Sequence, residues 1–439
     1  MKEILEQIKQ YTDAKNKNKT WVAGKDFVNY AGPYFDSEEI VSAAETLLSG
    51  WLVMGDKCLK FEREFPKQFG KDNGILTNSG SSSNLLMMAS LTSKRGANLP
   101  KGTKVLMPIA GFPTTLNPTL QVGFVPVFCD IEIGTLNIDL DHAEQLLAAD
   151  PEIKIITFAH VLGNPPNMDR VMELVKKHNL IFLEDCCDAL GSTYDGKPLG
   201  SYGQMASCSF YPAHHMTMGE GGYVACQTYE QEIILRSFRE WGRGCYCVGP
   251  EANKLKCGTC GNRFKEWIPT MPGEIFDHKY VYDEIGYNLK PIEIQGAMGL
   301  AQLKKLDEIH TLRRRNYQLL FNIYEKYEQF FHLPRATDKS NPSWFAFPLT
   351  IREDAPFSRT DIVDYLEENL IQTRPYFAGN IMLQPAYSHI MDPADAKANY
   401  PVATKVMTNT FFHGTSPVIT PEQIAYIGEK VDGFMSLFV

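Results

Sequence analysis

Hydrophobic positions recur with two different periods along this chain. Residues 1–14, 37–49 and 57–69 carry apolar side chains at helical spacing, which predicts three amphipathic helices. From about residue 72 to 230, short apolar runs of strand length alternate with helical patterns, as is typical of an α/β domain. The predicted strands are 74–77, 105–108, 125–128, 153–158, 181–184, 206–211 and 223–226, and the predicted helices between them include 83–91, 138–149 and 168–178.

A second change of pattern marks the C-terminal third. Residues 291–327 have apolar side chains at helical spacing and predict one long helix or a broken pair. A predicted strand, 345–351, and two predicted helices, 358–370 and 421–438, indicate a smaller C-terminal α/β domain. The expected parts are an N-terminal helical segment (1–50), a large domain (51–290) with a cysteine-rich insertion around 245–265, and the small domain (291–439).

The chain has 439 residues, of which 44% are hydrophobic and 22% are charged, as in ordinary soluble globular proteins. Its formal net charge of -9 is spread along the chain without a basic block, which argues against nucleic acid as the main partner. No apolar stretch approaches about 18 residues and the N-terminus is unlike a signal peptide, so we expect a cytoplasmic protein without a membrane span. Its ten cysteines should then be mostly reduced, and a clustered subset suggests metal rather than disulfides.

The segment 207–222, SCSFYPAHHMTMGEGG, contains the end of a strand, a sharp break and a glycine-rich turn before the strand 223–226. A strand, a break and a return strand present the side chains at the break to a cleft. His214 and His215 stand at this break. On its own such a histidine pair is more often part of a solvated loop, so the surrounding residues decide its interpretation.

This segment resembles the active-site loop of the DegT/DnrJ/EryC1 aminotransferase family, whose pattern is S-F-x-x-x-K-x-x-x-x-x-E-G-G. Ser209, Phe210 and residues 220–222 match, but His214 occupies the position of the lysine that holds pyridoxal phosphate (PLP) as an imine. Imidazole cannot condense with an aldehyde, so the resemblance implies a non-covalent cofactor and a histidine that acts as acid or base. This exchange marks a small subgroup, the ketosugar 3-dehydrases that use PLP or pyridoxamine phosphate (PMP).

Further phrases extend the resemblance over nearly the whole chain. Ser79–Asn84 precedes a helical run, where free N–H groups can bind a phosphate, although serine-rich helix caps are common. Asp185 ends a strand, where a carboxylate can pair with a pyridine nitrogen or simply cap a helix. The resemblance implies a catalytic role for His214 and cofactor contacts for Gly80, Ser81, Phe112, Asp185, Asp188, Ser209 and Asn288. Asn288 is implied to reach the cofactor of a neighbouring subunit, so a homodimer with shared active sites is expected.

Five cysteines, Cys187, Cys245, Cys247, Cys257 and Cys260, fall within one quarter of the chain. By themselves the pairs 245/247 and 257/260 look like a metal knuckle for zinc or an iron–sulfur cluster, and zinc is the commoner metal there. One branch of the histidine subgroup instead binds a 2Fe–2S cluster through C-x57-C-x-C-x7-C. The resemblance implies Cys187, Cys245, Cys247 and Cys260 as ligands, although twelve residues separate the last two. Cys260 is preferred because Gly-Asn-Arg-Phe follows it, and Cys257 is the alternative.

The resemblance implies a fold-type I, aspartate aminotransferase-like α/β fold with a mostly parallel central sheet. It also implies a PMP-dependent 3-dehydrase of a nucleotide-linked 4-keto-6-deoxyhexose, with CDP-4-keto-6-deoxy-D-glucose as the expected substrate, in 3,6-dideoxyhexose and lipopolysaccharide O-antigen biosynthesis. His214 would remove a proton, the C3 hydroxyl would leave, and a separate flavin and iron–sulfur reductase would supply electrons through the cluster.

Two alternatives to this function remain. One is a cluster-free GDP-4-keto-6-deoxymannose 3-dehydratase-type enzyme, which uses glutamate to regenerate PMP, and the cysteine set argues against it. The other is a non-catalytic scaffold of the PLP fold with a zinc knuckle. The loop 214–220, together with Asp185 and Ser209, argues against the scaffold.

Overall fold

A computed structural model describes residues 1–17, 20–247 and 255–438, so residues 248–254 of the predicted cysteine-rich insertion lie outside the described residues. A seven-stranded sheet forms the centre of the molecule, in the order β1-β9-β8-β5-β4-β2-β3. Its strands are β1 (Asn73–Thr77), β2 (Lys104–Pro108), β3 (Val125–Cys129), β4 (Ile153–Ala159), β5 (Ile181–Asp185), β8 (Met205–Ser209) and β9 (Gly222–Cys226).

Strand β9 runs antiparallel to both of its neighbours, β1 and β8, while the other neighbouring strands are parallel. Successive side chains feed two separate cores: Ile75 and Val105 belong to one, Leu76 and Leu106 to the other, and all four are fully buried. Both faces are therefore apolar, which is why these strands read as continuous apolar runs. All seven predicted strands are present, and the predicted α/β fold with a mostly parallel sheet is confirmed.

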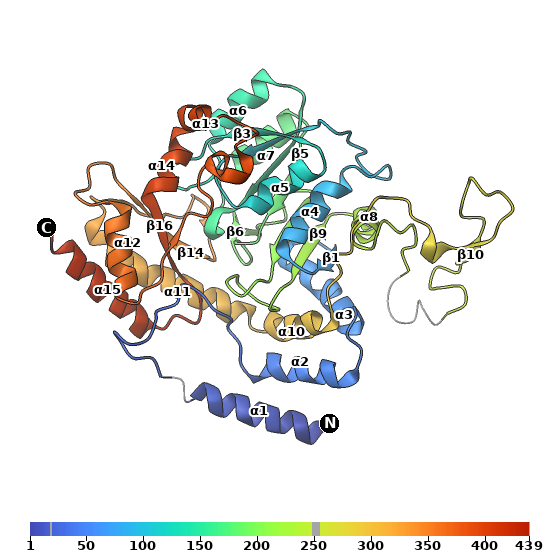
Figure 1. The fold of residues 1–439 in the computed structure, drawn as a ribbon, viewed down its shortest axis with the longest axis horizontal. Helices are drawn as coiled ribbons and strands as arrows, with labels where there is room; N and C mark the ends of the chain where they lie inside the picture. Colours follow the sequence, from blue (N-terminus) through green and yellow to red (C-terminus); the bar gives the residue numbers. More distant parts are fainter. Residues whose placement is uncertain (18–19, 248–254, 439) are drawn as a thin grey trace.

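Helices cover both faces of this sheet (Figure 1). Apolar side chains of α4 (Gly80–Ser90), α5 (Pro113–Gln121) and α8 (Tyr229–Arg239) fill the core on one face. On the other face the core takes side chains from α3 (Asp56–Glu64), α6 (Leu140–Ala149) and α7 (Met168–Lys177). The two cores together hold the carboxyl ends of the parallel strands in one fixed row.

Several predicted boundaries were wrong by a few residues, among them the following three. Helix α4 starts at Gly80 rather than 83, because the Ser79 side chain caps it and accepts a hydrogen bond from the Ser82 N–H. The predicted helix 57–69 divides into α3 and a 3-10 turn, Phe65–Phe69, which begins where Pro66 cannot donate to the helical ladder. The predicted strand 206–211 ends at Ser209.

A second, antiparallel sheet lies beside the first, in the order β12-β14-β16-β15. Its strands are β12 (Phe331–His332), β14 (Ala346–Ile351), β16 (Thr410–Gly414) and β15 (Arg374–Pro375), and α11 (Leu306–Tyr324), α12 (Arg359–Glu368) and α15 (Pro421–Met435) share its core. The predicted helix over 291–327 is the broken pair α10 (Glu293–Leu303) and α11. Smaller elements are α13 (Pro393–Asn399), α14 (Pro401–Asn409) and the short sheet of β13 (Ser340–Asn341), β6 (Thr193–Tyr194) and β7 (Lys197–Pro198).

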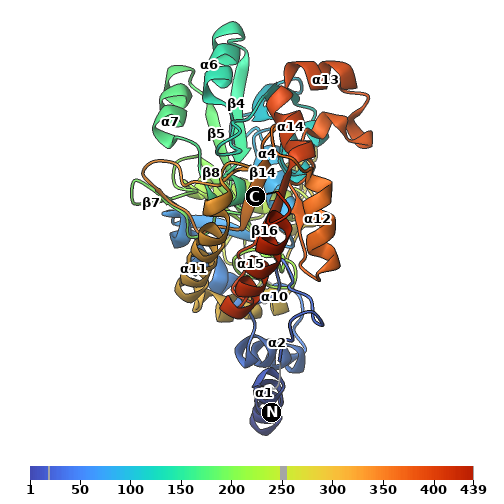
Figure 2. The same cartoon turned by 90° about the vertical axis from the view of Figure 1, so that its left-hand side faces the viewer.

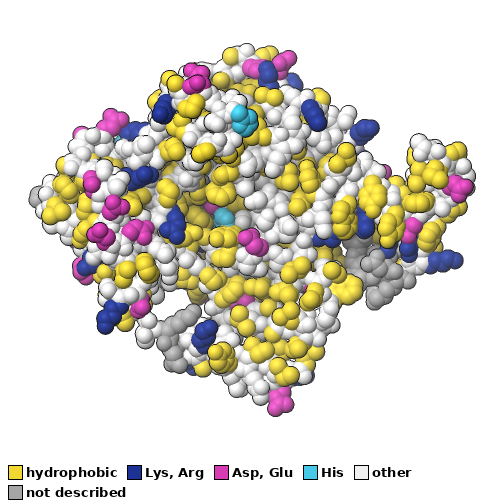
Figure 3. Space-filling model, in the orientation of Figure 1, with side chains coloured by type: hydrophobic (Ala, Val, Ile, Leu, Met, Phe, Trp, Pro, Cys, Tyr) yellow, Lys and Arg dark blue, Asp and Glu magenta, His cyan; other side chains and the backbone are white. Residues whose placement is uncertain are grey.

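Two parts extend from this body. Helix α1 (Lys2–Lys17) has no buried residue and lies outside α2 (Ser37–Ser49), at the lower end of the molecule in Figure 2. The second part, which we term the arm, comprises residues 245–247 and 255–280 with the hairpin of β10 (Phe264–Lys265) and β11 (Phe276–Asp277), at the right in Figure 1. Hydrophobic side chains gather on the arm and on the surface beside it (Figure 3). Among the described helices, none has the length and apolar character that a membrane span requires.

Candidate active site

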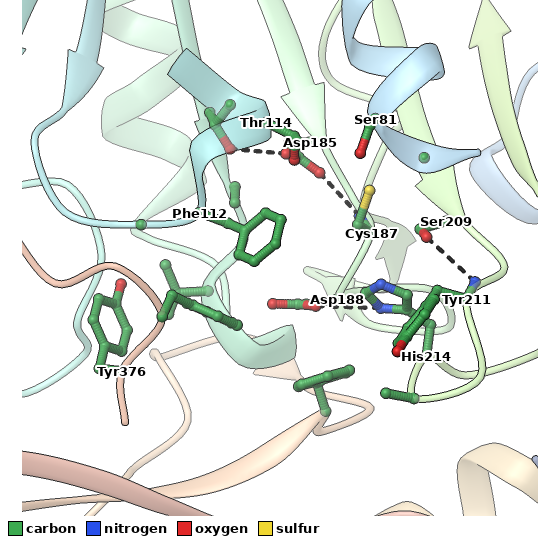
Figure 4. A pocket seen from close by; sticks show the side chains of 18 of the residues that line it. Ser81, Phe112, Thr114, Asp185, Cys187, Asp188, Ser209, Tyr211, His214 and Tyr376 are labelled. Carbon is green, nitrogen blue, oxygen red and sulfur yellow. Dashed lines mark hydrogen bonds and ion pairs between the residues drawn. The ribbon is translucent and has the colours of Figure 1, made fainter. Parts of the chain in front are cut away.

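A cavity of about 450 Å³ opens where the carboxyl ends of β2, β5 and β8 face the second sheet. Ligands of α/β folds commonly bind at this end of the strands. Most of the predicted site residues line this one cavity: Gly80, Ser81, Phe112, Asp185, Cys187, Asp188, Ser209 and His214 (Figure 4). The structure therefore brings together residues that are up to 134 positions apart in the sequence.

The amino end of α4 forms one wall of the cavity. A Cβ atom on Gly80 would lie 2.4 Å from the Cβ of Ser209, so only glycine lets the helix start approach β8 this closely. The Ser81 side chain lies at the cavity (Figure 4). Free N–H groups at a helix start, with hydroxyls beside them, form a site for an anion such as a phosphate. The roles of Gly80, Ser81 and Ser209 as phosphate ligands stay predictions.

Asp185 lies at the end of β5 and is 5% exposed. Its Oδ2 accepts hydrogen bonds from Asn84 Nδ2 at 2.8 Å and Thr115 Oγ1 at 3.0 Å. Its Oδ1 accepts from the Cys187 N–H at 3.2 Å and the Ser207 hydroxyl at 3.3 Å. Four donors replace the water that a buried carboxylate has lost, so the site supports a fixed negative charge. Such a charge fits a protonated pyridine nitrogen.

His214 projects into the cavity from the loop after β8 (Figure 4). Its ring centroid is 5.2 Å from that of Phe345, and its side chain is 16% exposed. Asp188 Oδ1 lies 3.4 Å from His214 Nδ1, which is within ion-pair distance, although the contact lacks hydrogen-bond geometry. The cavity thus contains an imidazole where the family pattern has an amine, and a role of His214 as acid or base stays a prediction.

Arg313 of α11 holds the histidine loop from behind. Its fully buried guanidinium donates hydrogen bonds to the carbonyl oxygens of Ala213, at 3.1 Å, and His214, at 2.8 Å. Burial lowers the pKa of Arg313 to about 9. His215 points elsewhere: its Nε2 lies 2.7 Å from the carbonyl oxygen of Ser343, and burial holds its pKa well below the usual value. Of the two histidines, His214 is the one that lines the cavity.

The cysteines predicted to bind a cluster lie in two places in the chain. Cys187 lines the cavity, 3.9 Å from the Ser207 hydroxyl oxygen, and burial raises the pKa of its thiol well above the usual value. Cys245, Cys247 and Cys260 belong to the arm, where Cys247 hydrogen-bonds with each of the other two thiols. None of the arm's described residues lines the cavity. The predicted ligands therefore lie in two places in the structure: Cys247 contacts two other thiols in the arm, while Cys187 faces the cavity.

Cys257 and Asn288 also lie outside the cavity. Cys257 is exposed in the arm, and its carbonyl oxygen is 3.9 Å from the sulfur of Cys260. Asn288 forms a backbone bridge with Glu240 and accepts a hydrogen bond from Lys290 Nζ at 2.8 Å. A contact between Asn288 and the cofactor of a neighbouring subunit stays a prediction.

The sequence analysis did not identify the residues that orient the predicted site residues. Asn84 and Thr115 hold Asp185 across 101 and 70 positions of sequence, and Arg313 holds the histidine loop across 99. No local motif indicates hydrogen bonds between residues so far apart in the sequence. Asn84 had one available signal, since it follows Gly80 by one helical turn and so lies on the same helix face. Arg313 had none.

Comparison with known proteins places this geometry in a family. The model of the DegT/DnrJ/EryC1/StrS aminotransferase family matches residues 33–432. The lipopolysaccharide biosynthesis protein RfbH of Salmonella typhimurium is 40% identical over 437 residues, which cover 99% of this chain and 98% of that protein. A dTDP-4-dehydro-2,6-dideoxy-D-glucose 3-dehydratase of Saccharopolyspora spinosa is 39% identical over 436 residues, or 99% of this chain and 92% of that protein.

A solved structure agrees with these relatives. The crystal structure of a mutant GDP-4-keto-6-deoxymannose-3-dehydratase (ColD) with bound GDP-perosamine matches with a TM-score of 0.79 and 28% identity. The match covers 92% of this chain and all of that one (100%). Sequence motifs, fold and relatives lead to one conclusion: this chain is an enzyme and belongs to the DegT/DnrJ/EryC1/StrS aminotransferase family.

Proposed function

We propose that this enzyme is a PMP-dependent 3-dehydrase, which removes the C3 hydroxyl of a nucleotide-linked 4-keto-6-deoxyhexose. The names of the relatives support a nucleotide-sugar substrate and either dehydratase or aminotransferase-like chemistry. His214 in the cavity is the observation that separates the two. Aminotransfer by this family needs a lysine amine for the imine with PLP, whereas an imidazole can only transfer protons.

The cavity has the groups that PLP or PMP would require. The start of α4 offers an anion site, Asp185 offers a fixed charge for the ring nitrogen, and the half-exposed ring of Phe112 can cover a planar ring. Bound PMP supplies an amine for the sugar ketone and a ring that draws electrons from the neighbouring carbon. Asp185 would support that role, because its carboxylate, held by four donors, offers a negative charge to a protonated ring nitrogen.

Nε2 of His214 is proposed to accept the proton that leaves C4′ of PMP. Asp188 would then face an imidazolium across 3.4 Å and stabilise its charge. The bond from Arg313 to the His214 carbonyl oxygen fixes the backbone that carries the ring. Phe345 packs against the ring and keeps water from that side. These contacts hold the base in one orientation without a covalent bond to the cofactor.

Several finer features belong to this proposal and rest on the resemblance. They are CDP as the nucleotide, a role in O-antigen dideoxysugar synthesis, a 2Fe–2S cluster, a flavin and iron–sulfur reductase as electron donor, a homodimer and a cytoplasmic location. Because one chain keeps Cys187 in the cavity and Cys245, Cys247 and Cys260 in the arm, we propose that two chains contribute to this ligand set. The proposed homodimer would supply the second arm.

Deuterium exchange tests the role of His214. In D2O with a nucleotide-linked 4-keto-6-deoxyhexose, the PMP-loaded enzyme should exchange the proton at C4′ of PMP. His214→Asn should still bind PMP but exchange at least about a hundredfold more slowly, since a general base contributes that much or more. His215→Asn is the matched control and should exchange at nearly the wild-type rate. Wild-type exchange in His214→Asn would show that another group is the base.

A further inference from the structure

One positive charge in the cavity is not used by the proposed chemistry. Arg374, on β15, is the only lysine or arginine among the described residues that line the cavity. Its neighbours in the lining include three acids, of which Asp185 has four donors and Asp188 faces His214. The described contacts of the Arg374 guanidinium are a hydrogen bond to the Thr373 carbonyl oxygen and a stack on a tyrosine ring. It is therefore a cation that no carboxylate of the described residues neutralises.

The ring on which Arg374 stacks is that of Tyr30, with the guanidinium carbon 4.3 Å from the ring centroid. The chain arranges this pair over a long distance in sequence. Val28 bridges Ile371, and the Tyr30 N–H donates to the side chain of Gln372 at 3.3 Å. The N-terminal segment is thereby held along the segment that leads into β15, and Tyr30 also lines the cavity. A cation and an aromatic face are thus fixed together in the lining of the cavity.

Aromatic rings connect this pair with the predicted cofactor site. Tyr30 lies 6.3 Å from Phe412, Phe412 lies 6.1 Å from Phe377, and Phe377 lies 5.9 Å from Phe112. All four residues line the cavity. A sugar bound against Phe112 can therefore extend along this aromatic wall towards Arg374. The start of α4 is the predicted site for the cofactor phosphate, so the substrate phosphates need a different cation.

We infer that Arg374 and Tyr30 bind the nucleotide part of the substrate. The guanidinium has the planar fork that binds phosphate oxygens in pairs, and a diphosphate is the strongest anion in a nucleotide sugar. The Tyr30 ring offers a face on which a nucleobase can stack. The inference rests on the proposed nucleotide-sugar substrate and adds the residues that bind its nucleotide.

Calorimetric binding of nucleotides, without turnover, tests this inference. CDP, GDP, dTDP and inorganic pyrophosphate are titrated separately into PMP-loaded wild-type enzyme and its variants. Arg374→Gln should weaken the nucleoside diphosphate that binds best, and pyrophosphate, by about 10- to 100-fold, because hydrogen bonds to a charged group are lost. Arg374→Lys should recover part of that affinity, since the charge returns without the fork. Tyr30→Ala should weaken the nucleoside diphosphate but leave pyrophosphate binding unchanged.

Arg335→Gln is the matched control, because this exposed arginine pairs with Glu328 outside the cavity and should bind as wild type does. PMP loading of each variant confirms that the cavity is intact. Arg374→Gln that binds both ligands within twofold of wild type would overturn the inference, as would wild-type enzyme that binds none of them. Equal losses of pyrophosphate and nucleoside diphosphate in Tyr30→Ala would remove the stacking role. Failure of the dehydration chemistry leaves these titrations unaffected, so the two proposals fail separately.

Discussion

At the scale of single residues, the chemistry depends on which side chain occupies position 214. A lysine there would supply a primary amine that bonds to PLP, whereas His214 supplies a ring nitrogen that cannot form an imine. Its surroundings fit a base, because Asp188 lies 3.4 Å from Nδ1 and Arg313 fixes the carbonyl oxygen of the same residue.

Borohydride reduction tests this reading of position 214. PLP-loaded wild-type protein treated with borohydride should keep the mass of the bare chain in intact mass spectrometry, because no imine to the chain exists to be reduced. His214→Lys should gain the mass of one reduced cofactor and serves as the positive control. A stable cofactor adduct on wild-type protein would contradict a non-covalent site.

The residues that belong to a recognisable phrase were predicted through the family resemblance. Gly80, Asp185 and His214 lie at strand ends or a helix start, where ligands commonly bind, but local chemistry alone equally allowed a helix cap or a solvated loop. Asn84 and Arg313 act through contacts that only the folded chain creates. Such partners cannot be identified from spacing along the sequence.

At the scale of elements, the long apolar runs were predicted well and the cavity walls less well. Strand β5 is buried along nearly its whole length, and its apolar run gives an unambiguous signal. Helix α5, which supplies Thr115, was missed because Pro118 lies inside it, where proline normally argues against a helix. The antiparallel pairing of β14 with β16 joins segments about 60 residues apart, and no local pattern indicates it.

The close approach of α4 to β8 leads to a prediction about cofactor affinity. Gly80→Ala places a Cβ atom 2.4 Å from that of Ser209, so the helix start must move. Overpacking of this kind costs about 1–3 kcal/mol, and PMP affinity should fall by the corresponding factor if the phosphate binds there. Gly134→Ala, where a Cβ meets nothing within 4 Å, is the matched control. Equilibrium dialysis with PMP measures both, and equal affinities would move the phosphate site away from α4.

The contact between α11 and β16 predicts a pH dependence of stability. The Tyr324 hydroxyl lies 2.6 Å from His413 Nε2, and burial lowers the pKa of His413 to about 3. The unfolded chain, with a histidine pKa near 6.5, binds a proton first as the pH falls. The stabilisation is therefore present above about pH 6.5 and lost towards pH 3, with a loss of about 2 kcal/mol by pH 5.

The double variant Tyr324→Phe with His413→Phe removes this titration while it leaves no buried polar atom of the pair unpaired. Urea unfolding at pH 7 and pH 5 should show a smaller acid destabilisation than in wild type, by about 2 kcal/mol. Both proteins still lose stability on acidification through other buried histidines such as His215. Identical pH dependence in both proteins would show that His413 is protonated without cost.

At the scale of the whole molecule, the arm and its apolar surroundings suggest a surface for a second chain. Ile275 is 62% exposed on the arm, and Ile285 and Val53 are 96% and 61% exposed on the body. Exposed apolar patches of this kind commonly mark protein interfaces. The proposed homodimer would cover them. It would also bring an arm of one subunit to the other, as the proposed sharing of the four cysteines needs.

Mixed dimers test whether the cysteine site is shared. Subunits with Cys187→Ser and with Cys260→Ser are co-expressed under different tags, and the mixed dimer is purified anaerobically. If the ligands come from two subunits, one site keeps all four cysteines and the dimer should hold about half the wild-type iron, with the electron paramagnetic resonance signal of a reduced cluster. A site within one chain leaves the mixed dimer without iron. Full iron in Cys187→Ser homodimers would instead assign the fourth position to Cys257.

The most direct test of the proposed dehydration follows the oxygen atom at C3. A nucleotide-linked 4-keto-6-deoxyhexose labelled with oxygen-18 in its C3 hydroxyl is incubated with PMP-loaded enzyme, and the label in the sugar and in water is measured by mass spectrometry. Cleavage of the C3–O bond releases the label whether or not electrons are supplied, so wild-type enzyme should lose it and His214→Asn should retain it. A wild-type enzyme that retains the label while it converts the C4 ketone into an amine would be an aminotransferase, contrary to the proposal.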